Sequence, residues 1–204
     1  MRAAVLQNEL MPAGLPAGRR VPRGRMRWYL VHTPEGMERT TCNKLLQIIP
    51  KNLLRDAFVL SKERWIKRAG SWSIQVSQMY PEYFFAVTDD VQGLNNALQK
   101  LSFHVDLVGA HERACMPLAG DARTFFEHAV GDGHLIRGSV GVLEDGVLRV
   151  TEGPLVGQED RVVKIDRHKR RCWVRIGEPG NGFLETLALD IPPVSQQADI
   201  LSSI

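Results

Sequence analysis

Cysteine is scarce in this chain, and the few cysteines stand far apart. Among 204 residues there are three, Cys42, Cys115 and Cys172, and no pair has the close spacing of a zinc-binding or redox motif. Three distant cysteines provide no disulfide framework, so we expect buried, reduced thiols in a cytoplasmic protein. No metal or other cofactor is expected.

Long apolar runs are absent as well. No stretch of about 18 apolar residues exists, which excludes a transmembrane helix, and the arginines near the N-terminus are not followed by an apolar segment, which argues against a secretory signal. A hydrophobic content of 44% and a charged content of 24% are ordinary for a globular protein. We therefore expect a globular protein without a membrane partner.

Catalytic motifs are missing too. One region gathers residue types that could perform chemistry: His111, Glu112, Cys115, Asp121 and His128. No nucleophile elbow, phosphate-binding glycine loop or metal-ligand spacing accompanies them. The sequence therefore predicts a protein that is not an enzyme.

Basic residues are absent from the end of the chain and concentrated at its start. Residues 178–204 contain four acids and no lysine or arginine, whereas residues 1–27 contain six arginines and one glutamate. The net charge of +3 conceals this asymmetry, which indicates a polyanionic partner near the basic parts. We expect residues 1–25 to be a disordered basic tail and residues 191–204 an acidic tail, and Met26 is an alternative translation start to Met1.

Residues 26–130 alternate between strand and helix patterns. Helices are expected from Thr33, as N-cap, to Pro50, after Asp89 or Asp90, and after Asp121. Residues 61–71 are polar and basic and are expected to form a hairpin arm. Strands are expected at Arg27–His32, Ala57–Leu60, Trp72–Met79, Tyr83–Thr88 and Val105–Val108.

Beyond residue 130 the sequence pattern changes. Residues 131–138 (GDGHLIRG) have three glycines and no periodicity, which is typical of a linker. Residues 139–190 contain five short strand patterns without a helix, which predicts a small barrel. Within it, Gly157 is expected in a turn that needs a positive φ, with Leu155 and Gln158 at the tip.

Three segments, in this order, carry a family resemblance. RWYLVHT and MYPEYFFAV are similar to the two signature strands of the NusG N-terminal (NGN) domain, and LRVTEGPLVGQEDRVVKIDRHKRRCWVRI resembles a KOW motif. IDRHKRR together with GSWSIQVSQMYPEYFFAVTDD most resembles the LoaP group of antitermination paralogues. The resemblance covers about residues 26–190. It implies an α+β NGN domain, with a four-stranded antiparallel sheet and helices, followed by an all-β SH3-like KOW barrel.

The resemblance also implies a function. Such proteins bind the clamp region of RNA polymerase beside upstream DNA and reduce pausing and termination, so we expect an antitermination factor recruited to selected operons. Glu82 and Asp160 stand where the family has glycine, and the tip lacks the aromatics by which general NusG proteins contact Rho or a ribosomal protein. A general NusG-type factor, and an RNA- or ribosome-binding KOW module without polymerase, remain as alternatives.

The resemblance places polymerase contacts on two neighbouring strands. In YFFAV, Phe84 and Ala86 point to one face and are expected in the core. Tyr83 and Phe85 point to the other face, which we expect to be an open apolar strip for polymerase. The candidate polymerase-binding residues are Tyr83, Phe85, Tyr80, His32 and Tyr29.

Three basic sites are candidates for binding a nascent RNA hairpin or upstream or non-template DNA. Cations neutralise phosphates and indoles stack on bases, and the arm interleaves its cations with Trp65 and Trp72. A solvated polar surface is the alternative at each site. The candidates are Arg64, Lys67 and Arg68 on the arm, Arg39 and Lys44 on the first helix, and Arg167, His168, Lys169, Arg170 and Arg171 in the barrel turn.

Overall fold

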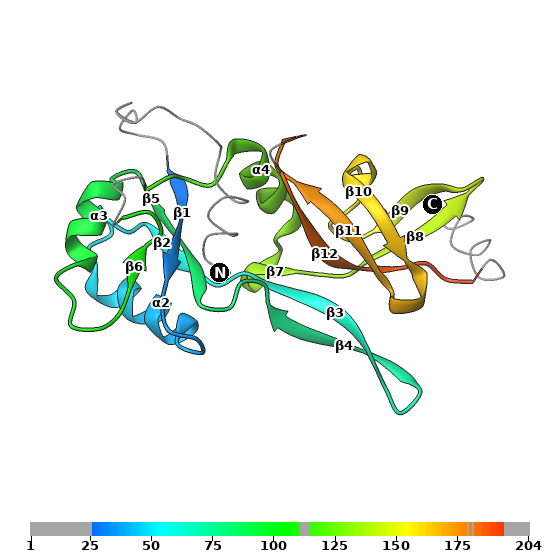
Figure 1. Cartoon of the computed structure of the whole chain (residues 1–204), viewed down its shortest axis with the longest axis horizontal. Coiled ribbons are helices and arrows are strands. Elements are labelled where there is room, and N and C mark those ends of the chain that lie inside the picture. The colour runs from blue at the N-terminus through cyan, green and yellow to red at the C-terminus, as the bar shows by residue number, and fades with distance from the viewer. Residues whose placement is uncertain (1–25, 111–114, 179, 181, 194–204) are drawn as a thin grey trace. The chain divides into compact units, whose positions relative to one another are not determined.

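A computed structural model describes residues 26–110, 115–178, 180 and 182–193 (Figure 1). Within these ranges the chain forms two compact units. Unit 1 comprises the residues up to Leu60, Gln78–Arg123 and Gly177–Gly182, and unit 2 comprises Ser61–Ser77, Thr124–Ile176 and the residues from Phe183 onward. The fold is mixed α+β. The basic tail expected at 1–25 and all but the first three residues of the acidic tail lie outside the described ranges.

Unit 1 contains a four-stranded antiparallel sheet with the order β2-β5-β1-β6. The predicted strands at Arg27–His32 and Tyr83–Thr88 are confirmed residue for residue. They pair along their whole length, from Arg27 opposite Thr88 to His32 opposite Tyr83. The strands are β1 (Arg27–His32), β2 (Asp56–Phe58), β5 (Tyr83–Thr88) and β6 (Asp106–Leu107).

Two helices of unit 1 follow these strands. Helix α3 (Val91–Leu98) begins after Asp90, whose carboxylate accepts a hydrogen bond from the backbone N–H of Gly93 at 2.9 Å, so this predicted cap is confirmed. The cap predicted at Thr33 is wrong because α2 (Glu38–Ile48) begins five residues later. The hydroxyl of Thr33 instead lies 3.0 Å from that of Thr41, inside the protein.

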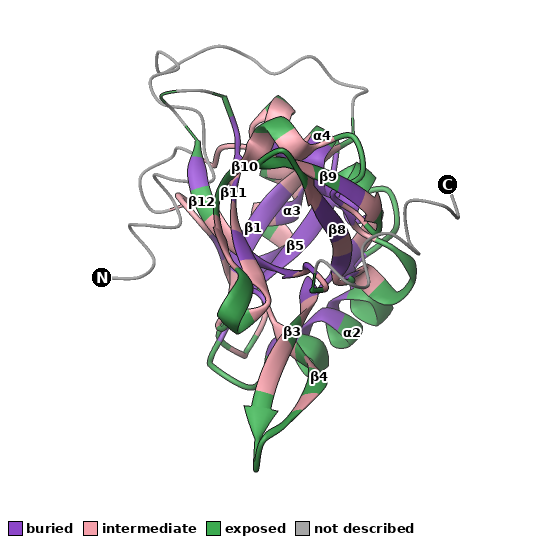
Figure 2. Ribbon diagram, turned by 90° about the vertical axis from the view of Figure 1, so that its right-hand side faces the viewer, coloured by how far each residue is buried: buried purple, intermediate pink, exposed green. Residues whose placement is uncertain are grey.

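The core of unit 1 lies between the helices and one face of the sheet. Phe84 and Ala86 are in this core, as predicted, together with Leu45 of α2 and Leu94 of α3. Figure 2 shows the buried residues of β1 and β5 as a continuous purple region. Burial of such side chains contributes about 1.5–3 kcal/mol each to stability. Tyr29, expected to contact polymerase, also belongs to this core.

Unit 2 begins with the hairpin of β3 (Ser61–Arg68) and β4 (Ser71–Gln78), which is the predicted arm. The stretch 131–138, expected to be a linker, contains the 3₁₀ turn η1 (Asp132–His134) and strand β7 (Leu135–Ile136). Strand β7 pairs in parallel with β3, with Leu135 opposite Ser61. Part of this glycine-containing segment therefore belongs to the sheet β4-β3-β7.

The predicted five strands beyond residue 138 are present and form a sheet with the order β10-β11-β12-β8-β9. Strands β12 and β8 are parallel, and the other neighbours are antiparallel. Helix α4 (Gly120–Ala129) begins one residue before Asp121, which was the expected cap. The strands are β8 (Ser139–Glu144), β9 (Val147–Glu152), β10 (Val162–Asp166), β11 (Arg171–Ile176) and β12 (Phe183–Asp190).

Leu155 lies in the turn after β9, where it was expected. It is fully buried, and its N–H donates to Ser139 Oγ at 3.2 Å. Asp160, named above as a replacement of glycine, lies in the 3₁₀ turn η2 (Glu159–Arg161) without a positive φ. Gly157 has a φ of 72°, as predicted.

Candidate nucleic-acid interface

The arm is held in shape by a two-residue turn. Ala69 and Gly70 have φ values of 48° and 83°, which is the conformation of a tight hairpin turn that matches the twist of its strands. Trp65 on β3 and Trp72 on β4 are half-buried, whereas Lys67 and Arg68 near the tip are exposed. The arm therefore presents two indoles with cations beside them.

The turn between β10 and β11 is built by its own side chains. The carboxylate of Asp166 accepts a hydrogen bond from the backbone N–H of Lys169 at 3.1 Å and closes the 3₁₀ turn η3 (Arg167–Lys169). Arg170 follows in the left-handed conformation with a φ of 48°. The backbone carbonyl of Arg170 then accepts a hydrogen bond from Leu189 on β12 at 3.1 Å. This geometry fixes the direction in which the basic turn leaves the sheet.

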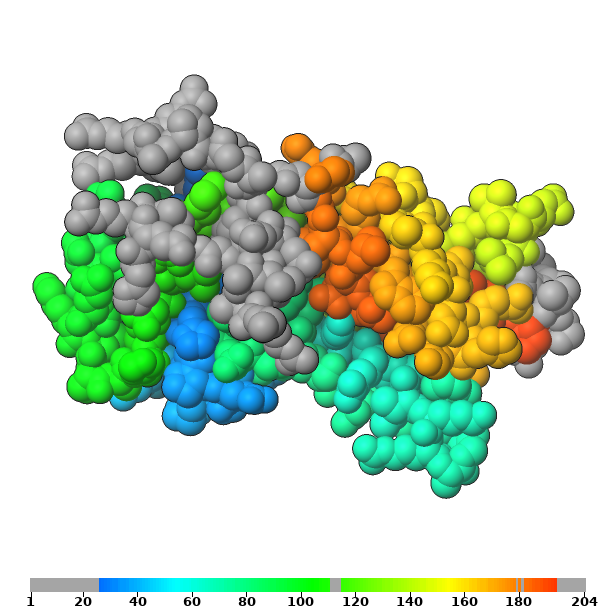
Figure 3. All heavy atoms as spheres, in the orientation of Figure 1, coloured from blue at the N-terminus to red at the C-terminus, as the bar shows by residue number. Residues whose placement is uncertain are grey.

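Arg170 brings the arm and the turn together. Its guanidinium carbon lies 4.7 Å from the ring centroid of Trp65 and 5.3 Å from that of Trp72, both within the range of a cation–π contact. The same guanidinium forms an ion pair with Asp190 at 3.3 Å. In Figure 3 the atoms of the hairpin lie against those of the β10–β11 turn. Two sites that are separate in the sequence therefore form one surface within unit 2.

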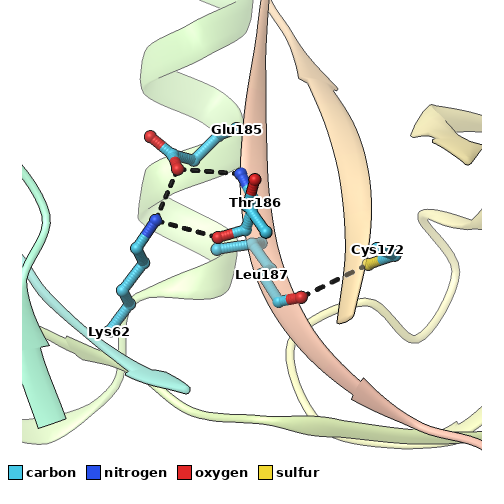
Figure 4. Close-up of polar contacts among 5 residues, drawn as sticks. All are labelled: Lys62, Cys172, Glu185, Thr186 and Leu187. Carbon is cyan, nitrogen blue, oxygen red and sulfur yellow. Dashed lines mark hydrogen bonds and ion pairs between the residues drawn. The ribbon is translucent and has the colours of Figure 1, made fainter. Parts of the chain in front are cut away.

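The base of the arm is held against β12. Lys62 Nζ donates to Glu185 Oε1 at 2.5 Å and to the carbonyl oxygen of Thr186 at 2.9 Å (Figure 4). Glu63 accepts a hydrogen bond from the backbone N–H of Gly138 at 2.7 Å. The side chains of Lys62 and Glu185 are only 16% and 15% exposed, so this pair is shielded from solvent. Lys62 consequently serves the attachment of the arm rather than a polyanion.

The five basic residues of the turn differ in their surroundings. The side chains of Arg170 and Arg171 lie beside carboxylates, those of Asp190 and Asp166, at 3.3 and 3.5 Å. Arg167, His168 and Lys169 are exposed. A carboxylate neighbour offsets the attraction of its partner for a phosphate, so the exposed residues supply most of the field that a polyanion meets. Arg64, Lys67 and Arg68 on the arm are exposed as well.

One aromatic group on this unit was missed by the sequence reasoning. Trp173 on β11 lies under two cations, with Arg171 at 4.8 Å and Lys164 at 5.0 Å from its ring centroid. In RCWVRI the buried residues Cys172, Val174 and Ile176 alternate with half-exposed ones, and this period would have placed Trp173 on the outer side.

The basic site expected on the first helix is exposed but is a separate feature of unit 1. Arg39 and Lys44 of α2 both face solvent, and Lys44 Nζ lies 3.9 Å from the centroid of the Phe103 ring. Leu46 and Ile48 on the same helix are 36% and 45% exposed. The surface of α2 is thus mixed in character, with apolar side chains between its polar ones.

The strip expected to be open for polymerase is buried, so this prediction of exposure is wrong. Tyr83 is 3% and Phe85 is 1% exposed, and Tyr80 is buried as well. Phe85 belongs to a layer of aromatic rings, with centroids 5.8 Å from those of Trp28 and Phe58. The alternation along β5 correctly separated two faces of the sheet, but both faces are covered.

His32 is the most exposed of the five polymerase candidates. It is half-buried at the end of β1, and its ring centroid lies 5.3 Å from that of Tyr83. Burial, and to a smaller extent the Glu82 carboxylate, raise the pKa of the Tyr83 phenol. The large apolar side chains that are exposed on the described part of unit 1 are Met26, Met37, Leu46 and Ile48.

Of the residues considered for catalysis, Cys115, Asp121 and His128 lie in the described part of the chain. His111 and Glu112 lie outside it. Burial raises the pKa of the Cys115 thiol, which disfavours the nucleophilic thiolate. Among the described residues, no group of three or more His, Cys, Asp or Glu side chains could hold a metal ion. No helix in the described ranges is long and apolar enough to cross a membrane.

No family model matches this chain, and no curated protein matches it. Among solved structures, the chain is similar to Thermotoga maritima NusG, in a structure concerning domain interaction in that protein, with 16% sequence identity and a TM-score of 0.43. The match covers 80% of this chain and 94% of that one. Identity and superposition at this level assign neither a family nor a function.

Proposed function

We propose that this protein is a transcription elongation and antitermination factor. It binds RNA polymerase through unit 1, binds nucleic acid through unit 2, and suppresses pausing and termination at selected operons. The polymerase part is supported by the resemblance of RWYLVHT and MYPEYFFAV to the NGN signature strands. These segments contain β1 and β5, which are neighbours in one sheet.

The observation that carries the nucleic-acid part is the position of Arg170 over Trp65 and Trp72. It joins the arm and the barrel turn into one surface with two indoles and exposed cations from both segments. Phosphates bind the cations, and bases stack on the indoles. Each unit thus has a distinct task in this proposal.

The burial of Tyr83 and Phe85 sets a condition on polymerase binding. Polymerase reaches these rings only in a form of unit 1 in which they are uncovered. His32, which is half-buried beside Tyr83, is the member of this surface that a partner meets first.

The same burial favours a second candidate function. A nucleic-acid-binding module that never meets polymerase has no need of an open aromatic strip, and its basic surface is complete in unit 2. This candidate predicts nucleic-acid binding by the full chain without any association with polymerase.

Association with purified RNA polymerase separates the two candidates. The full-length chain should bind the polymerase. His32→Glu, which places a charge at the edge of the aromatic layer, should weaken binding, whereas Leu46→Glu on the exposed face of α2 should not. Equal binding by both variants would place the contact elsewhere on the chain. Absence of binding by the unaltered protein would reject the polymerase part and leave the second candidate.

A further inference from the structure

The surface at Arg170 has two kinds of cation, and they differ in what they contact. Arg170 touches two indoles and Asp190, and it is only 31% exposed at its side chain. Arg167 and Lys169, in the same turn, are exposed. On the arm, Lys67 and Arg68 are exposed in the same way. Arg170 is thus held in the surface by both indoles and a carboxylate, whereas the other cations are exposed around it, with Lys67 Nζ 5.8 Å from the Trp72 ring centroid.

The indoles form a platform rather than part of a closed core. Trp65 and Trp72 are half-buried, and Ile74, two residues along β4 from Trp72, is 50% exposed. Residues two apart on a strand share a face, so Trp72 and Ile74 form one apolar surface. A base gains by stacking on such a surface only when its own flat face is accessible, which it is in an unpaired strand and not in the interior of a duplex.

From these contacts we propose that the surface binds unpaired nucleic acid, with bases on Trp65 and Trp72 and the sugar-phosphate strand along Lys67, Arg167 and Lys169. Arg170 is a positioning residue. Its planar guanidinium holds both indoles against the turn, while Asp190 offsets its charge. This inference rests on the proposed nucleic-acid role of unit 2. It adds that the ligand is single-stranded, and that Arg170 positions the indoles while the exposed cations contact phosphates.

The different roles of the exposed cations and of Arg170 can be measured by the salt dependence of binding. Each phosphate contact with a single strand contributes about −0.7 to the slope of log affinity against log salt concentration. Removing Arg167 or Lys169 should therefore make the slope shallower by about 0.7 each. Replacing Arg170 by lysine keeps the charge but removes the planar guanidinium that lies over both indoles, so affinity should fall while the slope stays the same.

The experiment uses the full chain and oligouridine and oligothymidine probes of about 12 nucleotides, within the usual range of single-strand sites. Binding is followed by quenching of tryptophan fluorescence over a salt series. We expect quenching by both single strands and poor competition by a duplex of equal length. Trp72→Ala should lower affinity at least about fivefold, as loss of one stacked base does, and Trp72→Phe should retain part of it.

Matched controls separate this site from general charge. Arg149→Ala removes an exposed cation of β9 in the same unit, which pairs with Glu144 at 3.8 Å, and should leave the salt slope unchanged. Trp28→Phe, in unit 1, should leave affinity unchanged. Circular dichroism confirms that each variant is folded, and the exposed substitutions at Arg167 and Lys169 test the site even if an indole variant unfolds.

Several outcomes would overturn the proposal. They are duplex binding as tight as single-strand binding, a salt slope that is the same in Arg167→Ala and Arg149→Ala, and unchanged affinity in Trp72→Ala and Arg170→Lys. Preference between the RNA and DNA probes identifies the sugar that is favoured. Readthrough of a terminator is measured separately, so a protein that antiterminates without binding unpaired strands would reject this inference alone.

Discussion

The carboxylate of Glu38 accepts a hydrogen bond from the backbone N–H of Glu82 at 2.7 Å. Glu38 stands at the start of α2 and is 4% exposed, and Glu82 precedes β5 with a φ of 71°. A non-glycine residue in the left-handed region is strained by roughly 1–2 kcal/mol. Glu38 therefore anchors the turn that holds Glu82 in this strained conformation.

This contact should make stability depend on pH. Burial of Glu38 alone would raise its pKa, but hydrogen bonds from the backbone N–H groups of Glu82, Glu38 and Gly36 and from Gln78 together hold the pKa below its ordinary value. A lowered folded-state pKa adds stability that is fully present above the unfolded pKa, about 4.3, and is lost as pH falls through the folded value. Glu38→Gln should thus be less stable than the unaltered protein at neutral pH, by about 1–3 kcal/mol.

Urea denaturation as a function of pH measures this difference. The difference in the free energy of unfolding between the unaltered protein and Glu38→Gln should become smaller below about pH 4.3. Glu38 is protonated first in the unfolded chain and, at lower pH, in the folded chain as well. Glu35→Gln, at an exposed position of the turn that precedes α2, is the control and should show no such difference in the free energy of unfolding. A difference that stays constant down to the acid transition would show that the Glu38 charge does not hold the turn.

Two glycines of unit 2 should respond differently to the same substitution. Gly153 and Gly157 have φ values of 92° and 72°, so alanine is strained at both. A Cβ at Gly153 would also lie 2.6 Å from the carbonyl oxygen of Gly138, whereas one at Gly157 meets nothing within 4 Å. Gly153→Ala should lower the free energy of unfolding by about 1–3 kcal/mol more than Gly157→Ala does, as measured by urea denaturation. Equal losses would mean that backbone conformation alone requires both glycines.

The ion pair of Lys62 with Glu185 should couple the arm to β12. Because the pair is shielded, a double-mutant cycle with Lys62→Met and Glu185→Gln should give a coupling of about 1–3 kcal/mol. The exposed pair of Arg149 with Glu144, whose side chains are 52% and 44% exposed, is the matched control and should give about 0–1 kcal/mol. A coupling no larger than the control would show that other contacts attach the arm.

Strand periodicity predicted the parts of this structure that depend on local pattern. The alternation in YFFAV separated Phe84 and Ala86 from Tyr83 and Phe85, and the structure places the first pair in the core beneath α2 and α3. Strand patterns in the sequence also predicted the five strands after residue 138. What the alternation could not decide is whether the other face is covered, since that depends on segments distant in the sequence.

Contacts between distant segments were beyond the sequence reasoning. Arg170 lies more than ninety residues from both indoles in the sequence, and nothing in IDRHKRR indicates that its guanidinium reaches Trp65 and Trp72. The pairing of β7 with β3 could not be predicted either, because a strand of two residues is too short to show a periodic pattern. Helix α2 begins later in the sequence than predicted, at Glu38, and Thr33 forms a hydrogen bond with Thr41 instead of capping the first turn.

The central claim is that the chain acts on transcribing polymerase and selects its transcripts by nucleic acid. In vitro transcription across an intrinsic terminator tests it most directly, with and without the protein, on templates that carry or lack the leader of its neighbouring genes. Readthrough should rise with the unaltered protein on the leader template, and the double variant Arg167→Ala/Lys169→Ala should lose that increase. Unchanged readthrough on both templates, with polymerase that elongates normally, would contradict the claim.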